Sequence, residues 1–327
     1  MKVLVTGATG FVGGAVVRAL VQRGINVRVL TRAGADLQNI QNLAVEPVEG
    51  DLRDPASLRT ALAGCQQLYH VAAHYALWAK DPSIFYEVNV TGTKNLLEAA
   101  REVGTERIVY CSTIGAIGLP PVGGLGTEQT PASLEQMAGH YKRSKYLAEQ
   151  EVLKLAQAGL PVVIVNPSAP VGIGDVKPTP TGQVIVDFMK GRMPAYIETG
   201  MNIVDIDDVA TGHMLAMQKG RIGERYILGG KNLMLREVLE ILSRVTGIKA
   251  PSVKLPRLAI LPLAYANQWV ANLTGHPPRI PLEGVKMAKY KMHYDCSKAI
   301  RELGIPQTPP EVALEKAARW FREHGYA

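Results

Sequence analysis

A tyrosine and a lysine stand four residues apart in the stretch GHYKRSKYLAEQ, at Tyr141 and Lys145. Residues i and i+4 are neighbours on a helix, so the two side chains would lie side by side. A phenol with a pKa of about 10 is a poor base at neutral pH, and a nearby ammonium group lowers that pKa. We expect Tyr141 to move a proton while Lys145 stabilises its phenolate and holds a ribose hydroxyl of a cofactor.

The helix that would carry this pair has an apolar stripe. The stripe continues through Ala148, Val152 and Leu155. Because an apolar stripe packs against a sheet or another helix, these residues orient the helix. Tyr141 and Lys145 lie on the same stripe and are predicted to point inward, toward the edge of a cofactor.

A second Tyr-x-x-x-Lys pair, Tyr294 and Lys298, shows that the spacing alone is not decisive. Tyr294 comes after every strand-helix unit, and Asp295 or Ser297 is suited to cap a short helix that follows. We interpret this pair as structural. Tyr141 instead opens the helix after the predicted fifth strand, beside the carboxyl ends where open α/β sheets bind ligands.

The predicted fifth strand ends in VYCSTIG, which places Ser112 and Thr113 at its carboxyl end. A hydroxyl there can hydrogen-bond a substrate oxygen and hold it against Tyr141. Thr113 is the first candidate for this catalytic role. Ser112 is the alternative, or supports the cofactor, and a simple capping role is open for both.

The first 165 residues contain the strands and helices that we expect to hold these side chains. Short runs rich in β-branched residues alternate with helical segments, which indicates parallel strands joined by crossover helices. Both faces of the runs are apolar, as expected when helices cover both sides of the sheet. The runs are KVLVT, VRVLT, AVEPVEG, QLYHVA, RIVYCS and PVVIVN, and the expected helices include Phe11–Arg23, Asp54–Ala63 and Ile84–Val103.

The fold class predicted is α/β: a Rossmann-type, doubly wound parallel sheet with a smaller, interleaved α/β substrate lobe. Residues 1–167 form the dinucleotide-binding domain, and 168–327 mainly form the substrate lobe. After about residue 167 the chain becomes rich in Pro and Gly, as in NPSAPVGIGDVKPTPTGQ. Parts of 201–230 again resemble strand and helix, and we expect them to complete the first sheet.

A glycine turn, VTGATGFVG, joins the first strand to the first helix and contains Gly7, Gly10 and Gly13. Glycine permits the tight turn and the close approach of the backbone to a pyrophosphate, which the helix N-terminus also attracts. The spacing is G-x-x-G-x-x-G rather than the more familiar G-x-G-x-x-G. The turn therefore predicts a dinucleotide site, whose further members are Thr9, Phe11 and Val12.

The preference for NAD or NADP depends on a residue about twenty positions after the glycine turn, where an acidic side chain would bind the ribose of NAD. Here the strand ends in Thr31 and Arg32, and a guanidinium suits a 2′-phosphate, so NADP(H) is favoured and NAD(H) is left open. Asp51 and Leu52 follow the third strand, where the carboxylate can accept from adenine. Ala72 and Ala73 follow the fourth strand and offer small side chains against the adenosine.

Composition excludes several classes of function. The 327 residues carry a net charge of +7 without a basic run interleaved with aromatics, so we expect no nucleic-acid partner and an anionic small molecule instead. Three distant cysteines suit reduced thiols in a cytoplasmic protein, and no metal-ligand spacing is present. The N-terminus does not have the pattern of a signal peptide.

The stretch LAILPLAYANQWVANL, residues 258–273, is the most apolar later segment. Pro262, Asn267 and Gln268 interrupt it, so it falls short of the roughly 18 apolar residues of a membrane span. We expect an amphipathic helix of the second lobe. Its apolar face either packs in the core or makes weak peripheral contact with a membrane.

Residues that line a substrate pocket are expected in the loops after the fourth and sixth strands. Loops at that edge of a doubly wound sheet carry binding residues, although simple loop packing is the alternative for each. Their mix of aromatic and hydroxyl groups suits a carbonyl compound, a sugar or polyol, a flavonoid-like ring or a lipid-linked polyol equally. The candidates are His74, Tyr75, Trp78, Ser168, Pro170 and Thr179.

Taken in order and spacing, these motifs resemble the extended short-chain dehydrogenases/reductases over nearly the whole chain. The resemblance rests on the glycine turn, Asp51-Leu52, HVAA, NVTGTKNLLEAA, CST and the Tyr141/Lys145 pair. It implies that Tyr141 and Lys145 also contact the cofactor, and it adds Pro167, in the NPS of the sixth strand, to the cofactor-binding residues. Many relatives form homodimers through the segments Tyr86–Ala100 and Tyr141–Ala156.

Two branches of the family compete: reductases similar to dihydroflavonol-4-reductase, and nucleotide-sugar epimerases and dehydratases. The segments GHYKRSKYLAEQE, VIVNPSAPVGIGDVKPTPTG and KGRMPAYIETG look like the bacterial proteins called hopanoid-associated sugar epimerases. Dehydratases follow the strand-end threonine with Asp-Glu, whereas Thr113 precedes Ile114-Gly115. The Arg-Pro-Gly-Asp stretch of epimerases is replaced by KYKMHYDCSKA, in which lysines could act as point charges.

The hypothesis that follows is an NADP(H)-dependent oxidoreductase that transfers hydride to a carbonyl. Tyr141 donates the proton, Lys145 tunes it and Thr113 fixes the carbonyl oxygen. The first alternative is a sugar epimerase that works through a transient keto intermediate with the same residues. The second is a cofactor-binding protein without turnover.

Overall fold

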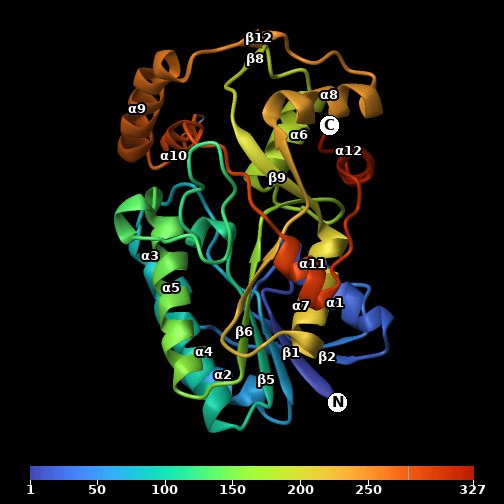
Figure 1. Cartoon of the computed structure of the whole chain (residues 1–327). Coiled ribbons are helices and arrows are strands. Elements are labelled where there is room, and N and C mark those ends of the chain that lie inside the picture. The colour runs from blue at the N-terminus through green and yellow to red at the C-terminus, as the bar shows by residue number, and fades with distance from the viewer. Residues whose placement is uncertain (279) are drawn as a thin grey trace.

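The large sheet organises the molecule. In the computed structural model, which describes residues 1–278 and 280–327, seven strands run parallel in the order β10-β6-β5-β4-β1-β2-β3. Figure 1 shows this sheet in the lower half of the molecule. A reversal of strand order between β1 and β4 makes this a doubly wound Rossmann sheet. The strands are β1 Lys2–Thr6, β2 Asn26–Thr31, β3 Val45–Glu49, β4 Gln67–His70, β5 Arg107–Cys111, β6 Val162–Pro167 and β10 Arg225–Leu228.

Alternate residues of each strand enter two different cores, because successive side chains point to opposite faces. Val3 and Val5 of β1 pack with α1, α7 and α11, whereas Leu4 packs with α2, α4 and α5. Burial of both faces explains why the strands read as continuous apolar runs. The helices are α1 Phe11–Gln22, α7 Ile206–Lys219, α11 Ser297–Leu303, α2 Pro55–Leu62, α4 Gly92–Glu102 and α5 Gly139–Gln157.

The helix expected over 84–103 is composite. A short α3, Ser83–Tyr86, passes into a π-helical turn, Glu87–Thr91, and then into α4. A π turn adds one residue per turn and often lies at a functional site. Here it buries Asn89, whose side chain accepts a hydrogen bond from the backbone of His74 and donates to Ser144 of α5.

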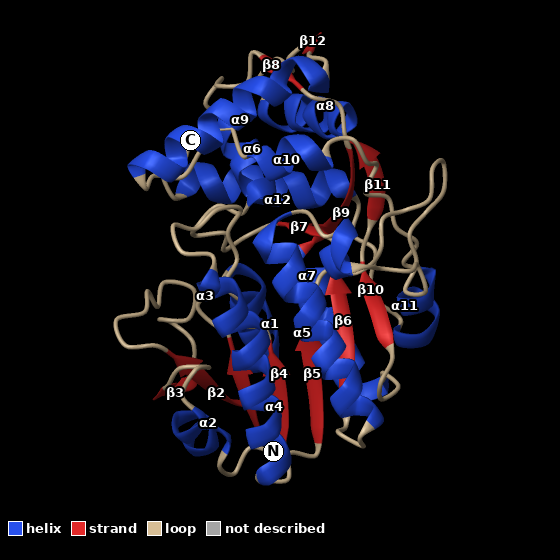
Figure 2. Ribbon diagram, turned by 90° about the vertical axis from the view of Figure 1, so that its left-hand side faces the viewer, coloured by secondary structure: helices blue, strands red, loops and turns tan. Residues whose placement is uncertain are grey.

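The second lobe contains a small sheet in the order β11-β9-β7 and most of the remaining helices (Figure 2). Its core joins α6, α8 and α12 to that sheet. The elements are β7 Ala169–Val171, α6 Pro180–Met189, β8 Ala195–Tyr196, β9 Gly200–Asp205, β11 Lys231–Met234, α8 Leu235–Thr246, β12 Val253–Lys254, α9 Arg257–Thr274, α10 Leu282–Met287 and α12 Pro310–Glu323. Short 3-10 turns lie at Ile114–Ala116 and Leu134–Gln136.

The two lobes are interleaved. After β6 the chain enters the second lobe, and β10 then returns to pair in parallel with β6 as the edge strand of the large sheet. Within 201–230, α7 and β10 therefore belong with the large sheet. β9 belongs with the small one, since it pairs with β7 and β11.

Candidate active site

The glycine turn has the geometry of a phosphate cradle. Gly7 adopts a φ of +74°, and a Cβ at this position would lie 2.6 Å from the backbone nitrogen of Ala72. A Cβ at Gly13 would collide with the carbonyl oxygen of Gly7. Side chains are therefore excluded from the turn, and backbone N–H groups are left to face outward.

The first turn of α1 is also suited to an anion. Gly10 is its N-cap, and no side chain of the described residues caps it. The N–H groups of Phe11, Val12 and Gly13 are thus available at the positive end of the helix dipole. These residues fit the pyrophosphate of a dinucleotide.

Asn39, which the sequence reasoning missed, braces this turn. Its amide donates to the carbonyl oxygens of Thr9 at 3.1 Å and Gly174 at 3.0 Å. The side chain therefore ties the glycine turn to the loop after β7. Its position in an irregular segment between β2 and β3 gave no periodic signal that could have identified it.

Two arginines lie near the end predicted to hold the adenosine. Arg53, which sequence reasoning did not single out, forms a two-point ion pair with Asp51, and Nη2 lies 2.9 Å from Oδ2. The Arg53 hydrogen bonds lower the pKa of Asp51, and the charge of Arg32 lowers it further. Arg32 is exposed after β2. The two guanidiniums together suit an anionic group on a ribose.

Leu52 and Ala72 each pack closely against a glycine, and contact of Leu52, Ala72 and Ala73 with an adenosine stays a prediction. Leu52 is buried beneath Gly92 of α4, where a Cβ would lie 2.7 Å from the Leu52 Cβ. Ala72 adjoins Gly7, and its backbone N–H donates to the Thr6 hydroxyl at 3.2 Å. The loop after the fourth strand thus lies against the glycine turn.

Tyr141 lies in the first turn of α5 and meets residues from two loops. Its ring packs against Tyr75, with centroids 4.6 Å apart. The Thr113 side chain hydrogen-bonds the Tyr141 phenol. The Thr113 hydroxyl also accepts from the N–H of Gly115 at 3.0 Å, which fixes its rotamer. The structure therefore brings Tyr141, Thr113 and Tyr75 together at the carboxyl end of β5.

The expected lowering of the Tyr141 pKa by Lys145 is corrected here. Burial raises the pKa of Tyr141 well above its ordinary value, and the neighbouring Tyr75 raises it further. A buried phenol resists ionisation because the phenolate loses its hydration. The Tyr141 hydroxyl therefore stays protonated at neutral pH, so a proton is present there for transfer.

Lys145 is held by other partners. Its Nζ donates to the hydroxyl of Tyr110 and to the carbonyl oxygen of Cys111, both at 2.9 Å. The ammonium also lies 4.5 Å from the centroid of the Tyr110 ring. Burial lowers the pKa of Lys145 to about 8. An ammonium has three protons, so one remains for a further acceptor.

Behind Lys145 lies a buried polar chain that the sequence did not reveal. The two ring nitrogens of His70 hydrogen-bond the hydroxyls of Thr6 at 2.8 Å and Thr93 at 2.9 Å. Thr93 also interacts with Tyr110, the partner of Lys145. Burial lowers the pKa of His70 to about 3, so its ring is neutral. The chain runs from the glycine turn to Lys145.

Three of the buried polar atoms that have no hydrogen-bond partner among the described residues are hydroxyl or imidazole groups at this edge. They are Ser112 Oγ at the end of β5, Ser168 Oγ after β6 and His74 Nε2 after β4. Buried polar atoms are nearly always paired, so these three have capacity for a further partner, either water or a ligand. They are compatible with a nicotinamide and substrate placed between these strand ends.

The other predicted substrate residues have mixed surroundings. Tyr75 is half-exposed beside Tyr141, and Trp78 donates from Nε1 to Asn272 of α9 at 3.2 Å. Thr179 caps α6, and its hydroxyl donates to Asp175 at 2.9 Å. Pro170 lies in β7, and Pro167 is buried at the end of β6. Their contact with a substrate stays a prediction.

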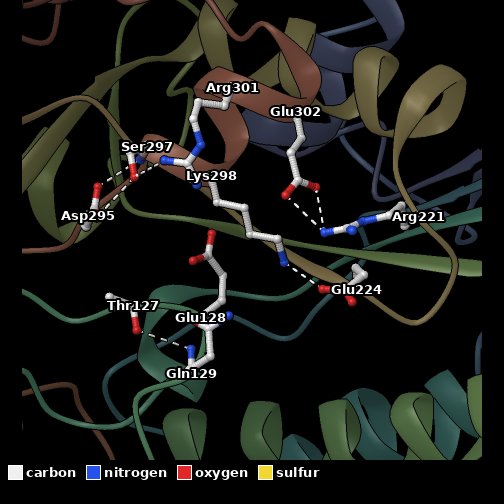
Figure 3. Close-up of a pocket in the computed structure, with 10 residues that line it drawn as sticks. All are labelled: Thr127, Glu128, Gln129, Arg221, Glu224, Asp295, Ser297, Lys298, Arg301 and Glu302. Carbon is white, nitrogen blue, oxygen red and sulfur yellow. Dashed lines mark hydrogen bonds and ion pairs between the residues drawn. The ribbon is translucent and has the colours of Figure 1, made fainter.

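The second Tyr-x-x-x-Lys pair lies in a different place. Tyr294 is buried, and its hydroxyl donates to the carbonyl oxygens of Ile114 and Gly118. Lys298 lines the separate pocket of Figure 3, where its Nζ lies 2.7 Å from Glu224. Ion pairs cross this pocket, including Arg221 with Glu302. The pair holds loops together, as its position after the last strand-helix unit indicated.

The comparisons with known proteins place this geometry in a family. A sequence model of the NAD dependent epimerase/dehydratase family matches residues 3–229. The chain belongs to this family. Its members are oxidoreductases, epimerases and dehydratases that bind NAD(H) or NADP(H), and the match covers all seven strands of the large sheet.

Members of the NAD dependent epimerase/dehydratase family align with nearly the whole chain. The "Putative dihydroflavonol 4-reductase" of Synechocystis sp. is 47% identical over 98% of this chain and 95% of its own. "Sterol demethylase protein B" of Methylococcus capsulatus is 37% identical over 99% of both chains. The crystal structure of gox2253 superposes with a TM-score of 0.89 at 50% identity, over 99% of both chains.

Proposed function

We propose that this protein is an NADP(H)-dependent reductase that transfers hydride to the carbonyl of an organic substrate. The observation that carries the proposal is the meeting of Thr113 and Tyr141 at the carboxyl end of β5, with Lys145 buried beneath them. Two hydroxyls that converge there can both bind one carbonyl oxygen.

Each of the three residues has a separate role in the transfer of hydride and proton. Bound NADPH supplies the hydride. Tyr141 donates its proton to the oxygen as negative charge develops there, and its raised pKa keeps that proton in place beforehand. Thr113 orients the same oxygen. Lys145, fixed by Tyr110 and Cys111, presents its third proton to a ribose hydroxyl and its charge to the developing alkoxide.

The preference for NADP(H) rests on Arg32 and Arg53. No acid stands at the end of β2, where NAD-binding chains place a carboxylate for the ribose. Arg32 is exposed there and free to turn toward a 2′-phosphate, and Arg53 brings a second guanidinium within reach of the same region. Two such groups bind a phosphate by charge-assisted hydrogen bonds.

The substrate class that fits is a cyclic or aryl-substituted ketone or aldehyde. Tyr75 offers aromatic surface beside Tyr141, and Trp78 lies in the same loop after β4. The relatives at 47% and 37% identity carry names that refer to a dihydroflavonol and to a sterol, both polycyclic. Flat ring systems gain from stacking on aromatic side chains.

The test is multiple-turnover oxidation of NADPH with a panel of aldehydes, cyclic ketones and sugar nucleotides. Tyr141→Phe should lower kcat about 10²- to 10⁴-fold, the contribution of a general acid, with the Kd for NADPH nearly unchanged. Tyr146→Phe, on the same helix, is the matched control and should keep full activity. Full turnover in Tyr141→Phe would refute the assignment.

Epimerisation is the second candidate, because the family includes epimerases and the same three residues could reverse hydride transfer. Lys286, Lys289 and Lys291 stand near the segment where epimerases grip a pyrophosphate, and supply point charges. Purified protein that holds NAD(H) tightly and interconverts sugar nucleotides without net use of NADPH would favour it. Cofactor binding without either activity would favour a non-catalytic protein.

A further inference from the structure

Helix α9 is packed in an unusual orientation. Its small residues face the lobe, with Ala264 and Ala271 buried. Its large apolar residues face outward, with 69% of Leu258, 66% of Trp269 and 67% of Leu273 exposed. An ordinary surface helix places these classes the other way round. In Figure 1, α9 stands at the outer edge of the upper lobe, beside α10.

The exposed face of α9 is apolar across its full width. At 3.6 residues per turn, its members fall within an arc of about 160° that contains no charged residue. Asn272 and Thr274 border the arc. We call this surface the α9 face; its members are Leu258, Ala259, Pro262, Leu263, Tyr265, Ala266, Trp269, Val270 and Leu273.

Exposure of so many apolar side chains to water is unfavourable in free energy. Contiguous exposed apolar patches of more than a few hundred Å² are rare on monomeric proteins and mark surfaces that contact an apolar partner. Each large side chain withdrawn from water contributes about 1.5–3 kcal/mol. None of the described helices has the length and hydropathy needed to cross a bilayer.

The stretch of sequence that contains α9 is strongly basic. Residues 241–294 contain eight Lys and Arg and a single acid, Glu283, which gives +7. The rest of the chain contains 28 basic and 28 acidic residues and is neutral. The net charge of the protein thus resides in this segment. Lys286 lies beside the face, with its Nζ 5.2 Å from the centroid of the Tyr265 ring.

We propose that the α9 face docks on the surface of an anionic lipid bilayer. An amphipathic helix with apolar residues on one side and lysines alongside lies in the interfacial plane of such a membrane. Anionic lipids attract nearby basic residues, each worth about 1 kcal/mol. A second copy of the chain is the poorer occupant, because two segments of +7 would repel each other.

The α9 face also adjoins the candidate active site. Asn272 of α9 accepts the hydrogen bond from Trp78, in the loop after β4 that carries Tyr75. Glu283 of α10 accepts from the backbone N–H of His140, next to Tyr141. A docked protein would therefore hold these loops close to the lipid. The docking itself is independent of the proposed chemistry.

The experiment is co-sedimentation of the full chain with vesicles of phosphatidylcholine, with and without phosphatidylglycerol. Binding is expected only to the anionic vesicles and is expected to weaken in high salt. Trp269→Ala should lower partitioning about tenfold, as should the double change Lys254→Gln and Lys286→Gln. Circular dichroism checks that each variant is folded.

Matched controls lie elsewhere on the surface. Ile222→Ser removes a half-exposed apolar side chain before β10, and Lys94→Gln removes an exposed charge from α4. Both should leave partitioning unchanged. The proposal is overturned if anionic vesicles are not bound, if Trp269→Ala binds them as well as the parent protein, or if light scattering shows a dimer that Trp269→Ala dissociates without any vesicle binding.

Discussion

Lys145 owes its position to Tyr110. The Tyr110 hydroxyl accepts from the ammonium at 2.9 Å, and its ring lies beneath the charge. Burial raises the pKa of Tyr110 well above its ordinary value, so this hydroxyl stays protonated and can accept without ionising. Tyr110 is thus a positioning residue for Lys145, and His70 and Thr93 support it from behind.

Tyr110→Phe should weaken catalysis without preventing folding. Loss of an acceptor destabilises the charged amine, so the pKa of Lys145, about 8 in the parent, should fall. We expect kcat to drop about tenfold, and the alkaline limb of the kcat profile to move to lower pH. A lower kcat with an unmoved limb would indicate a merely structural role.

Arg32→Ser tests cofactor choice. Removal of a guanidinium that pairs with the 2′-phosphate should raise the KM for NADPH about tenfold to hundredfold and leave that for NADH nearly unchanged. Steady-state kinetics with both cofactors measures this. Equal losses with NADPH and NADH would show that Arg32 does not distinguish them.

The proximity of the reacting residues was predictable from the sequence, whereas their supports were not. Thr113 follows β5 and Tyr141 begins α5, the helix after that strand, so the regular alternation of strands and helices brings them together. His70 and Asn39 act through contacts with residues distant in the sequence. No local period marks such contacts, and the pKa of Tyr141 depends on burial that only the packed structure gives.

At the scale of elements, α5 begins against a carboxylate from the other lobe. Glu283 of α10 accepts from the backbone of His140 and faces Lys142. A carboxylate at a helix N-terminus pairs with its unsatisfied N–H groups. Gly139 leaves space for the Glu283 carboxylate, since a Cβ there would overlap it. The φ of Gly139 is +77°, which also favours glycine.

Gly139→Ala should therefore be more harmful than an equivalent change elsewhere. Gly24 also has a left-handed backbone, with φ of +70°, but a Cβ there meets nothing within 4 Å. Gly24→Ala should cost about 1 kcal/mol in the free energy of unfolding, and Gly139→Ala about twice as much because Glu283 must move. Urea unfolding compares the two, and equal costs would contradict the contact.

Periodicity was sufficient for the strands and for most helix ends. It did not show the π turn at Glu87–Thr91, since one extra residue scarcely changes the apolar pattern. Periodicity predicted helix α9 but not its orientation, because the sequence pattern of an apolar stripe is the same whether the stripe faces the core or the solvent. The orientation depends on Ala264 and Ala271, which allow close packing against the lobe.

The whole molecule should be sensitive to acid through buried histidines. Burial lowers the pKa of His70 to about 3 and that of His213 to about 4. Below about pH 6.5 these histidines are protonated in the unfolded chain but stay neutral in the folded chain. The free energy of unfolding therefore decreases as the pH is lowered. At about pH 5 each histidine should remove about 2 kcal/mol.

His213→Gln should remove the contribution of one histidine to this loss of stability at low pH. The glutamine does not titrate, so the fall in unfolding free energy between about pH 7 and pH 5 should shrink by about 2 kcal/mol. Urea unfolding at the two pH values measures the difference. Parallel pH dependence in variant and parent would contradict the neutral state of His213.

The return of β10 to the edge of β6 has a consequence for synthesis on the ribosome. When residue 167 emerges, β6 is an uncapped edge with unpaired backbone groups, and its neighbour at 225–228 has not yet been translated. Open edges of this kind invite pairing with other chains. During synthesis the protein therefore passes through a six-stranded state in which the backbone of β6 is exposed. We expect this state to be prone to aggregation and to be the one that a chaperone binds.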